Sequence, residues 1–549
     1  MSKPERPEPG KHGRPYAGRW VARLGGRIVA QGGTPRQALL AAKAARSKET
    51  PQVEFMPSEM NYLLPAIVER VRQALPANQE IYLVGGAVRD LLLGRTHHDF
   101  DFVLPAKAIA AARRVANALA ADFYPLDETR DAGRVLLTES GERISLDFIA
   151  FMGKDIDGDL AARDLTVNAM AIDLRNPDAL LDPFGGAADI RAKRIRGCSP
   201  EAFRSDPVRI LRAVRLAATL GMKIEKETRQ HLRAAAPRLT SVSPERMRDE
   251  LFRLLESPKL AASLRALDLL DALGVVFPEL PSLKGIEQPS PHAFDVWGHT
   301  FNVIEKLEAA LALLAGGSAP EGAADLHSGL VALSLGRYRP QISELMKQEL
   351  VSARFRRALL MLAAIFHDTG KPGTRSVEES GRIRFIGHED ESAELAAQHA
   401  KTLHLSNAEI ELLESVVRLH GRPFALTRTG APPTRRAIYR FFREAGEAGV
   451  DICLLSLADF MGKYAADLPQ EELTKHLVTL RTLLEAFFEN PEQAVQPLAL
   501  LNGDELMQEL GLTPGPKVGE ILEELREAQA AGEVRTRDEA LAFAKSRLG

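Results

Sequence analysis

The stretch from Tyr82 to Leu104, YLVGGAVRDLLLGRTHHDFDFVL, constrains the fold of this chain more than any other. Residues 81–84 form an apolar run typical of a short buried strand, which stops at a Gly-Gly turn before a helical segment. Residues 98–104 then alternate polar and apolar side chains, which predicts a half-buried strand. Side chains two apart on a strand share a face, so Asp99 and Asp101 are expected to lie side by side.

Two neighbouring carboxylates on a strand repel each other unless a proton or a cation lies between them. Paired divalent metals about 3.5–4 Å apart would relieve that repulsion and activate a hydroxyl for attack on a phosphate. Backbone N–H groups at Gly85 and Gly86, where a helix begins, would face phosphates. The alternative is a tight turn followed by two solvated aspartates. The glycines together with Arg89-Asp90 at this spacing make it the weaker interpretation.

The same stretch resembles the opening motif of the polymerase-β nucleotidyltransferases, and more narrowly of the class II tRNA nucleotidyltransferases and bacterial poly(A) polymerases. Their pattern, G-G-x-V-R-D-x-L-L-G-x-x-x-x-D-x-D, is matched at Gly85, Gly86, Val88, Arg89, Asp90, Leu92, Leu93, Gly94, Asp99 and Asp101. The resemblance implies that Asp99 and Asp101 bind two Mg²⁺ ions. One ion would activate a tRNA 3′-hydroxyl and the other would neutralise the triphosphate. Gly85, Gly86 and Arg89 would contact the nucleotide.

The bulk properties predict a cytoplasmic, multidomain chain. At 549 residues it is too long for one core, so three or more domains are expected. No apolar run could span a membrane, and the polar, Pro-rich start has no export signal, so no membrane partner is expected. Cys198 and Cys453 make neither a disulfide framework nor a zinc motif. The net charge is only −3, so nucleic-acid binding would require a local basic surface.

Residues 1–55 are expected to form a small ββα unit with a disordered start up to about residue 17. Residues 19–24 and 27–30 indicate a hairpin around a Gly-Gly turn, and Thr34-Pro35 would open a helix to about residue 46. The unit could contact RNA or serve as a docking module, and we prefer the second interpretation.

Residues 56–192 are predicted to form the nucleotidyltransferase head, with helices at 63–75 and 106–121 and strands at 134–137 and 143–149. If its mixed sheet is like that of the family, Asp147 lies beside the strand of Asp99 and Asp101 and is a candidate third catalytic carboxylate. The alternative is a strand-end aspartate with a structural partner.

Residues 160–171 resemble the family's second motif, R-R-D-F-T-x-N-A-M, with Ala162 where the first Arg is usual. By this resemblance, Arg163, Asp164 and Asn168 handle the ribose and the triphosphate. Arginine suits polyphosphate because its hydrogen bonds are bidentate and charge-assisted. A local surface ion pair between Arg163 and Asp164 is the alternative.

Residues 193–285 are predicted to be a helical, nucleotide-selecting and RNA-binding neck. Residues 191–253 hold sixteen Lys and Arg against seven Asp and Glu. A helix is expected to start near Ser205, with Ser205 or Asp206 as its cap and Pro207 in its first turn. Asp206 and Arg209 would then share one helical face and offer acceptors and donors suited to a Watson–Crick edge.

The family's fourth motif is E-D-x-x-R, a protein template that chooses CTP or ATP. Here Asp206 and Arg209 match, Ser205 replaces the Glu, and Arg212 would also contact the nucleotide. The replacement leaves the orientation of Arg209 open. The alternative is a capping Asp with an ion pair three residues away.

Residues 286–490 contain a second group of candidate ligands: His299, His367, Asp368, His388, His420 and Asp459. Imidazoles and carboxylates suit transition metals or Mg²⁺ and Mn²⁺, and the set is large enough for two ions. The order resembles the HD phosphohydrolase domain, H…HD…H…H…D. This implies hydrolysis of phosphate esters, with 2′,3′-cyclic phosphates or 2′-phosphates on RNA ends as substrates and Ni²⁺, Mn²⁺, Co²⁺ or Mg²⁺ as metal. The alternative is a scaffold without metal.

The expected fold class is therefore α+β and multidomain: a polymerase-β-like head with a mixed sheet, a helical neck, an all-α HD domain and a helical tail at residues 491–549. The implied function is template-independent addition of C, C and A to tRNA from CTP and ATP. Two rivals stay open. One is a poly(A) polymerase or a partial, CC- or A-adding enzyme. The other is an HD hydrolase with a degenerate binding head, against which the intact Asp99 and Asp101 argue.

Overall fold

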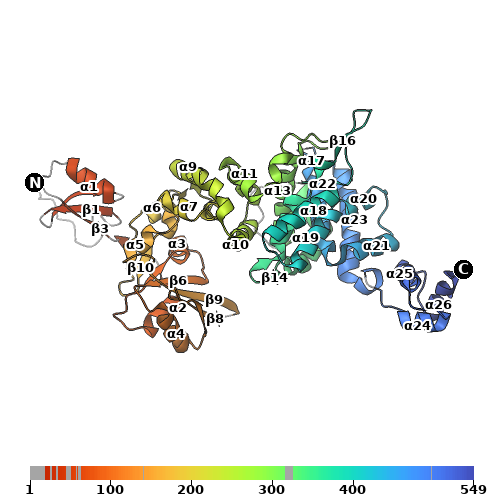
Figure 1. Ribbon diagram of the computed structural model, residues 1–549, viewed down its shortest axis with the longest axis horizontal. Coiled ribbons are helices and arrows are strands. Elements are labelled where there is room, and N and C mark those ends of the chain that lie inside the picture. The colour runs from red at the N-terminus through yellow and green to blue at the C-terminus, as the bar shows by residue number, and fades with distance from the viewer. Residues whose placement is uncertain are drawn as a thin grey trace, which may run out of the picture. The chain divides into compact units, whose positions relative to one another are not determined.

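The computed structural model describes residues 19–24, 27–32, 35–44, 51–56, 58–59, 63–139, 141–315, 326–465, 467–495 and 497–548. The chain divides into two compact units, Met1–Leu239 and Thr240–Gly549 (Figure 1). The start up to residue 17, the turn at residues 25–26 and the expected cap at residue 34 lie outside the described residues.

The N-terminal element group contains one strand more than the sequence predicted. Strands β1 (Arg19–Leu24) and β2 (Arg27–Gly32) and helix α1 (Pro35–Ala44) confirm the hairpin and the helix. Strand β3 (Gln52–Met56) then pairs antiparallel with the other edge of β1, so the sheet order is β2-β1-β3. The predicted ββα unit was therefore wrong, because it lacked strand β3. Residues 52–55, QVEF, alternate polar and apolar side chains, and pairing covers the open edge of β1.

The head is built on an eight-stranded mixed sheet of order β4-β11-β10-β5-β6-β9-β8-β7. Its only parallel neighbours among the described strands are β6 and β9. The strands are β4 (Ser58–Glu59), β5 (Tyr82–Val84), β6 (Asp99–Leu104), β7 (Asp122–Asp127), β8 (Ala132–Glu139), β9 (Glu142–Ala150), β10 (Ala171–Asp173) and β11 (Ala179–Leu181). The strands predicted at residues 134–137 and 143–149 are thus confirmed as parts of β8 and β9.

Strand β6 separates an apolar face from a polar one. Phe100, Phe102 and Leu104 are almost fully buried, and the Phe102 ring stacks on Phe148 of β9 with 5.0 Å between ring centroids. Burying one such side chain stabilises the fold by about 1.5–3 kcal/mol. Asp99 and Asp101 alternate with these residues and therefore project from the other face. Helices α2 (Ala66–Ala74) and α4 (Ala108–Leu119) correspond to the two predicted helices, and α4 packs on β8 and β9.

The end of the first unit is helical, but one helix boundary differs from the prediction. Helix α7 (Glu201–Ser205) ends where α8 (Arg209–Leu220) was expected to begin, and α8 has no side-chain cap. Proline disfavours helical geometry in the residue before it, and Asp206 has the non-helical backbone angles φ −141° and ψ 83°. The expected cap at Ser205 or Asp206 was therefore wrong. The remaining elements are α3 (Gly86–Leu92), α5 (Ile156–Ala161), a 3₁₀ turn η1 (Thr166–Asn168), α6 (Gly186–Arg191), β12 (Arg194–Ile195), β13 (Lys223–Ile224) and α9 (Lys226–Ala235).

The second unit is a helical assembly with two small hairpins. Its long helices are α10 (Pro244–Leu255), α11 (Leu260–Leu269), α13 (Val296–Leu314), α14 (Leu326–Leu335), α15 (Arg339–Met346), α16 (Arg356–Phe366), α18 (His388–Thr402), α19 (Asn407–Leu419), α21 (Arg435–Ala445), α22 (Gly449–Gly462) and α23 (Gln470–Glu489). Shorter pieces are α12 (Leu273–Val276), α17 (Lys371–Thr374) and α20 (Arg422–Thr427). The hairpins pair β14 (Glu349–Val351) with β15 (Arg354–Phe355) and β16 (Arg375–Val377) with β17 (Ile383–Phe385). Every residue of α22 is buried, as its nearly all-round apolar sequence requires.

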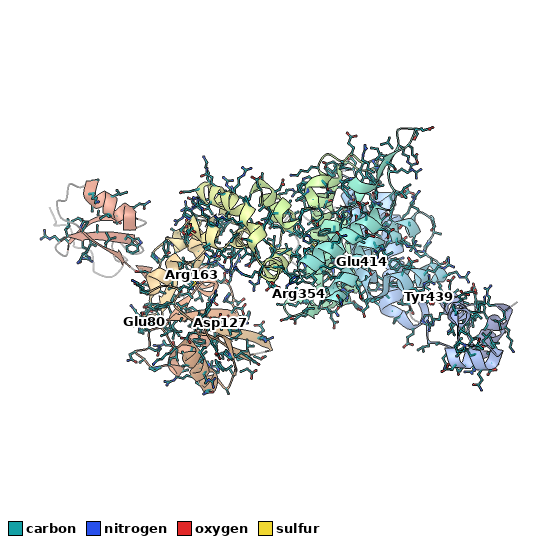
Figure 2. All side chains as sticks on the ribbon, in the orientation of Figure 1. Glu80, Asp127, Arg163, Arg354, Glu414 and Tyr439 are labelled. Carbon is teal, nitrogen blue, oxygen red and sulfur yellow. The ribbon has the colours of Figure 1, made fainter. Side chains whose placement is uncertain are left out.

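Two buried ion pairs tie secondary-structure elements of this unit together. Arg356, at the start of α16, donates from Nε and Nη2 to Asp451 Oδ2 of α22 at 2.9 and 2.6 Å. Both side chains are almost completely buried. Burial raises the pKa of Asp451, although Arg356 opposes that shift. Arg354, labelled in Figure 2, forms the second pair with Glu409 of α19.

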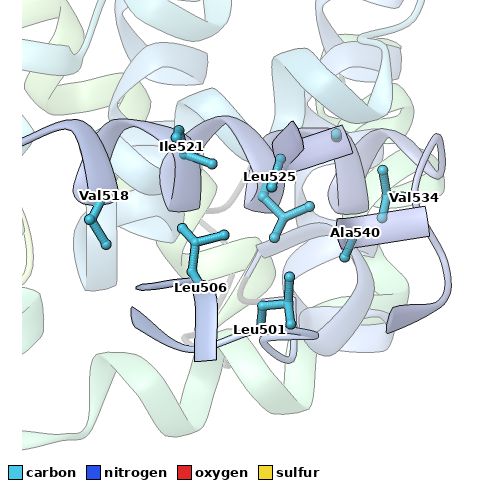
Figure 3. Close-up of a cluster of buried hydrophobic side chains, with 9 residues drawn as sticks. Leu501, Leu506, Val518, Ile521, Leu525, Val534 and Ala540 are labelled. Carbon is cyan, nitrogen blue, oxygen red and sulfur yellow. The ribbon is translucent and has the colours of Figure 1, made fainter. Parts of the chain in front are cut away.

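The tail forms a small core of its own. Helices α24 (Gly503–Leu510), α25 (Pro516–Ala531) and α26 (Arg537–Ser546) enclose a cluster of buried apolar side chains (Figure 3). Capping boxes at Asn502 and Thr536 start α24 and α26. Within the described part of the chain, no helix combines the length and apolarity that a membrane crossing needs.

Candidate functional site

The turn between β5 and α3 brings the backbone close to two charged side chains. Gly85 has φ +74° and ψ −138°, a region that only glycine adopts without strain. A Cβ atom on Gly85 would lie 3.1 Å from Arg163 Nη1 and 3.2 Å from Asp101 Oδ2. The missing side chain therefore leaves space directly over a carboxylate oxygen of Asp101.

Strand register places the candidate carboxylates next to one another. Asp101 lies opposite Asp147 in the parallel pair of β6 and β9, and Asp99 lies opposite Ser145. Burial raises the pKa of Asp101, as does the negative charge of Asp147, while Arg163, His97 and Arg212 act in the opposite direction. A half-buried carboxylate beside a second carboxylate, at the lining of a cavity, fits a cation that would favour its ionised form.

Asp147 is held by an arginine that the sequence analysis did not single out. Arg134 of β8 lies opposite Asp147 in the antiparallel register and donates to both of its carboxylate oxygens at 2.7 Å. Sequence alone shows Arg134 only as one residue of an apolar strand. Its position becomes meaningful once the registers of β8, β9 and β6 are known together.

A second network connects the opening motif with the second motif. Arg89 donates to both oxygens of Asp90 at 2.9 Å and to Asn168 Oδ1 at 2.7 Å. His97 Nδ1 lies 3.0 Å from Asp90 Oδ2. All three guanidinium nitrogens of Arg89 thus bond to protein atoms, and Arg89 ties α3 to the turn η1.

One cavity of about 240 Å³ gathers most of the candidate residues of the head. Its lining includes Gly85, Gly86, Asp101, Arg163, Asp164, Asn168, Arg209 and Arg212. These residues come from four separate stretches of sequence. The arrangement offers two carboxylates, three guanidinium groups and an amide at one location.

The polar groups of the second motif do not form the local pair that was weighed as an alternative. Arg163, labelled in Figure 2, instead bonds to the buried Asp159 at 3.0 and 3.2 Å. Asp164 Oδ1 accepts from Leu165 N at 2.8 Å, while its buried Oδ2 accepts no hydrogen bond from the described residues. Arg212 Nε lies 3.6 Å from that oxygen. Asp164 Oδ2 at the cavity thus faces the Arg212 guanidinium as an ion-pair partner but accepts no hydrogen bond from the described residues.

Asp206 and Arg209 form an ion pair, with 3.3 Å between Oδ2 and Nε. Arg209 Nη1 also donates to the carbonyl oxygens of Ala162 and Ala202, at 3.2 and 3.3 Å. Ser205, in the place of the family's Glu, donates to the carbonyl of Glu201 in its own helix at 2.9 Å. Main-chain oxygens and Asp206 therefore orient Arg209, whose orientation the sequence analysis left open.

In the second unit, six separated side chains converge. His299 comes from α13, His388 from the start of α18 and Asp459 from α22. His367 and Asp368 directly follow α16, and His420 follows α19. Two triplets have ligand atoms within 4.8 Å of one another: His299, His367 and Asp368, and Asp368, His388 and His420. Asp368 belongs to both triplets, and Asp459 Oδ1 lies 3.0 Å from His299 Nε2.

Main-chain carbonyls orient three of these imidazoles. The Nδ1 atoms of His367, His388 and His420 bond to the carbonyls of Ala364, Phe385 and Val417 at 2.8, 2.7 and 2.7 Å. A protonated Nδ1 leaves the Nε2 lone pair available, which is the usual arrangement of a metal-binding histidine. The donor set and its orientation therefore fit divalent metal ions.

The surroundings of two histidines in this cluster shift their pKa values in opposite directions. Burial would lower the pKa of His388, but Asp368 and Glu389 outweigh burial and raise it to about 9. Burial and the neighbouring His367 lower the pKa of His420 to about 4. Neutral His420 is ready to act as a ligand, whereas His388 needs a cation to displace its proton.

Four further residues around the cluster were missed by the sequence analysis. Lys371 Nζ lies 2.6 Å from both Asp368 Oδ2 and Gln288 Oε1, and Lys463 Nζ lies 3.1 Å from Asp459 Oδ2. The ring of His292 packs edge-on against His299, with 5.2 Å between centroids. Each lysine is three or four residues from its aspartate on a helical stretch, a spacing that could have pointed to it.

Comparison with known families agrees with this division of the chain. Residues 81–196 match the Poly A polymerase head domain and residues 326–459 match the HD domain. Residues 221–283 match a family described as "Probable RNA and SrmB- binding site of polymerase A". Residues 14–59 match a family of unknown function.

Individual relatives match over most of the chain. The A-adding tRNA nucleotidyltransferase of Deinococcus radiodurans is 34% identical, over 84% of this chain and 94% of that protein. The CC-adding tRNA nucleotidyltransferase of Thermus thermophilus is also 34% identical, over 85% of this chain and 93% of that protein. A solved CCA-adding enzyme in complex with ATP covers 89% of this chain and 97% of its own, with a TM-score of 0.58 and 21% identity. The last match supports the fold.

The mixed-sheet head and the extent of these matches define a nucleotidyltransferase that carries an HD domain. More narrowly, the chain belongs to the class II tRNA nucleotidyltransferases.

Proposed function

We propose that this enzyme extends the 3′ end of tRNA with C, C and A, using CTP and ATP. The observation that carries the proposal is the cavity where Gly85, Asp101, Arg163 and Arg209 meet. A triphosphate needs cationic donors, a nucleotidyl transfer needs ionised carboxylates, and base selection needs a directed donor. The cavity supplies all three.

We infer that Asp99 and Asp101 hold Mg²⁺, with Asp147 as the neighbouring third carboxylate. The raised pKa of Asp101 and the space left over it by Gly85 support a cation at this position. When bound, the metal supplies activation of the attacking 3′-hydroxyl and neutralisation of the triphosphate.

The chain's own residues would bind and orient the nucleotide. Arg163 would donate to phosphate oxygens, and Asp164 Oδ2, a buried acceptor without a hydrogen bond, would accept from a ribose hydroxyl. Arg209, fixed by two main-chain carbonyls and Asp206, would present its remaining donors to the base. Arg89 would brace the turn that carries these groups, because its nitrogens are already bonded.

A partial activity is the second candidate, and the names of the relatives favour it. Two proteins that are 34% identical to this chain are an A-adding and a CC-adding enzyme. Every motif of the head is compatible with either product, as it is with a poly(A) polymerase.

The experiment uses three tRNA transcripts, ending at the position before the first C, after C, and after CC, each with labelled CTP or ATP. Full addition predicts two C residues on the first transcript and one A on the third. A CC-adding enzyme leaves the third unchanged, an A-adding enzyme extends only the third, and a poly(A) polymerase adds many A residues. Loss of all extension in Asp101→Ala, with wild-type melting temperature, ties the activity to this site. No extension of any transcript by the wild type would refute the proposal.

We further propose that the HD cluster hydrolyses 2′,3′-cyclic phosphates or 2′-phosphates on RNA ends, in a cytoplasmic enzyme that also binds tRNA through its basic neck. The two triplets sharing Asp368 support two divalent ions, of which Ni²⁺, Mn²⁺, Co²⁺ and Mg²⁺ are candidates. Hydrolysis would prepare a damaged RNA end for extension.

The double variant His367→Ala, Asp368→Ala should lose both the hydrolysis and the bound transition metal, while nucleotide addition continues. Unchanged metal content, or no hydrolysis by the wild type with any of the four ions, would assign the domain a scaffold role.

A further inference from the structure

Arg134 occupies a specific position beside the carboxylates of the head. It projects from β8 onto Asp147 of β9, and Asp147 in turn lies opposite Asp101 of β6. Three neighbouring strands thus place an arginine, an aspartate and a second aspartate in one row across the sheet. Neither the family motifs nor the cavity lining includes Arg134.

The contact between Arg134 and Asp147 is a two-pronged one. Arg134 Nε donates to Asp147 Oδ1 and Nη2 donates to Oδ2, each at 2.7 Å. A bidentate contact of this kind fixes the plane of a carboxylate, which a single hydrogen bond cannot do. Asp147 is 18% exposed and Arg134 is 40% exposed, so the contact lies at the boundary between sheet and solvent.

The same contact places a positive charge against the row. The Arg134 guanidinium pairs with the Asp147 carboxylate at 2.7 Å, and Asp147 lies opposite Asp101 on the neighbouring strand. Arg134 therefore offsets one of the three negative charges and leaves two that face the space above β6.

We propose that Arg134 is a positioning residue for nucleotidyl transfer: it holds Asp147 in a fixed orientation and offsets its charge, so that Asp99 and Asp101 determine metal affinity. The proposal rests on the proposed function of the head. Without Arg134, Asp147 would be free to rotate toward the cation as an additional ligand. Metal would then bind more tightly and in an altered position, and transfer would slow.

The test measures how much Mg²⁺ the full-length protein needs to bind a non-hydrolysable CTP analogue, by calorimetry. Asp101→Ala serves as the blank for metal-dependent binding at this site. Removal of the positive charge in Arg134→Gln should lower the half-saturating Mg²⁺ concentration about three- to tenfold and reduce the rate of C addition. Asp147→Asn leaves the positive charge of Arg134 without its negative partner, so it should raise the half-saturating Mg²⁺ concentration by a similar factor. The double variant should return to near the wild-type value.

Arg134→Lys separates charge from geometry. It should keep the wild-type Mg²⁺ requirement but lose the two-pronged contact, so that only the rate of addition falls. Melting temperatures identify variants that fail to fold, and if Arg134→Gln is among them, Asp147→Asn still decides. A folded Arg134→Gln with an unchanged or higher Mg²⁺ requirement, or an Asp147→Asn variant with an unchanged or lower one, overturns the proposal. A wild type that binds the analogue without any metal dependence refutes instead the proposed function of the head.

Discussion

Replacement of Gly85 by alanine should inactivate the head by a mechanism that can be separated from simple destabilisation. Gly85 combines a positive φ with close contacts: its added Cβ would lie 3.1 Å from Arg163 Nη1 and 3.2 Å from Asp101 Oδ2. Both distances are shorter than ordinary van der Waals contact for a carbon atom. The methyl group would enter the space that a cation or phosphate needs.

The magnitude has two parts. Backbone strain at φ +74° and ψ −138° costs about 1–3 kcal/mol in the free energy of unfolding. Displacement of Asp101 and Arg163 by a few tenths of an ångström adds a loss of rate, which we expect to be about ten- to a hundredfold.

The matched control is Gly221→Ala. Gly221 ends α8 with φ 63° and ψ 35°, and an added Cβ there would meet no atom within 4 Å. This variant should lose about 1–2 kcal/mol of stability and keep its activity. Chemical denaturation and single-turnover addition of labelled CMP measure the two effects. If Gly85→Ala adds nucleotides within twofold of Gly221→Ala at a temperature where both are folded, the close approach at Gly85 has no role in the reaction.

Three further outcomes are expected. Asp206→Ala or Arg209→Ala should change the ratio of CTP to ATP use by about tenfold or more, because a site with unpaired polar groups discriminates poorly. The ratio is measured by competition between the two nucleotides. An equal ratio in wild type and variants would show that other residues select the base. Ser205→Glu should alter that ratio less than about twofold, because two main-chain carbonyls already orient Arg209; a larger change in the same competition assay would show that this orientation is incomplete. Arg356→Met should lower the free energy of unfolding of the second unit by about 3–5 kcal/mol in urea titrations, because it leaves Asp451 buried without its partner. Adding Asp451→Leu should recover most of this loss. An Arg356→Met variant as stable as wild type would contradict this account of the buried pair.

The sequence predicted those parts of the fold that local patterns determine. Strand β6 was predictable because its apolar residues recur every second position, and so was the turn before α3 because two glycines interrupt an apolar run. The start of α8 was predicted wrongly at Ser205. The effect of Pro207 on the residue before it opposed the capping tendency of Asp206, and the two cannot be weighed from sequence alone.

Contacts that depend on strand register or on helix packing were harder to predict from the sequence. Residues 147 and 101 could be placed on neighbouring strands only by analogy, and nothing local to Arg134 indicates its partner. The six HD residues could be named from their order along the chain, but the sharing of Asp368 between two triplets requires their positions in space. Contacts made by main-chain groups, such as the carbonyls beside Arg209, cannot be predicted from the identity of the side chains.

The parallel pairing of β6 with β9 in the head sheet affects how the chain assembles during synthesis. Strands β5 and β6 form a local antiparallel pair, yet the other edge of β6 gains its partner β9 only after residues 105–141 have been made. Until then an apolar strand edge stays open, which is a hazard for intermolecular pairing. Non-local strand pairing is also slow because loop closure precedes its stabilising contacts. Nascent chains stalled before residue 142 should therefore remain prone to aggregation, and Asp101 acquires Asp147 as its neighbour only after β9 has been made.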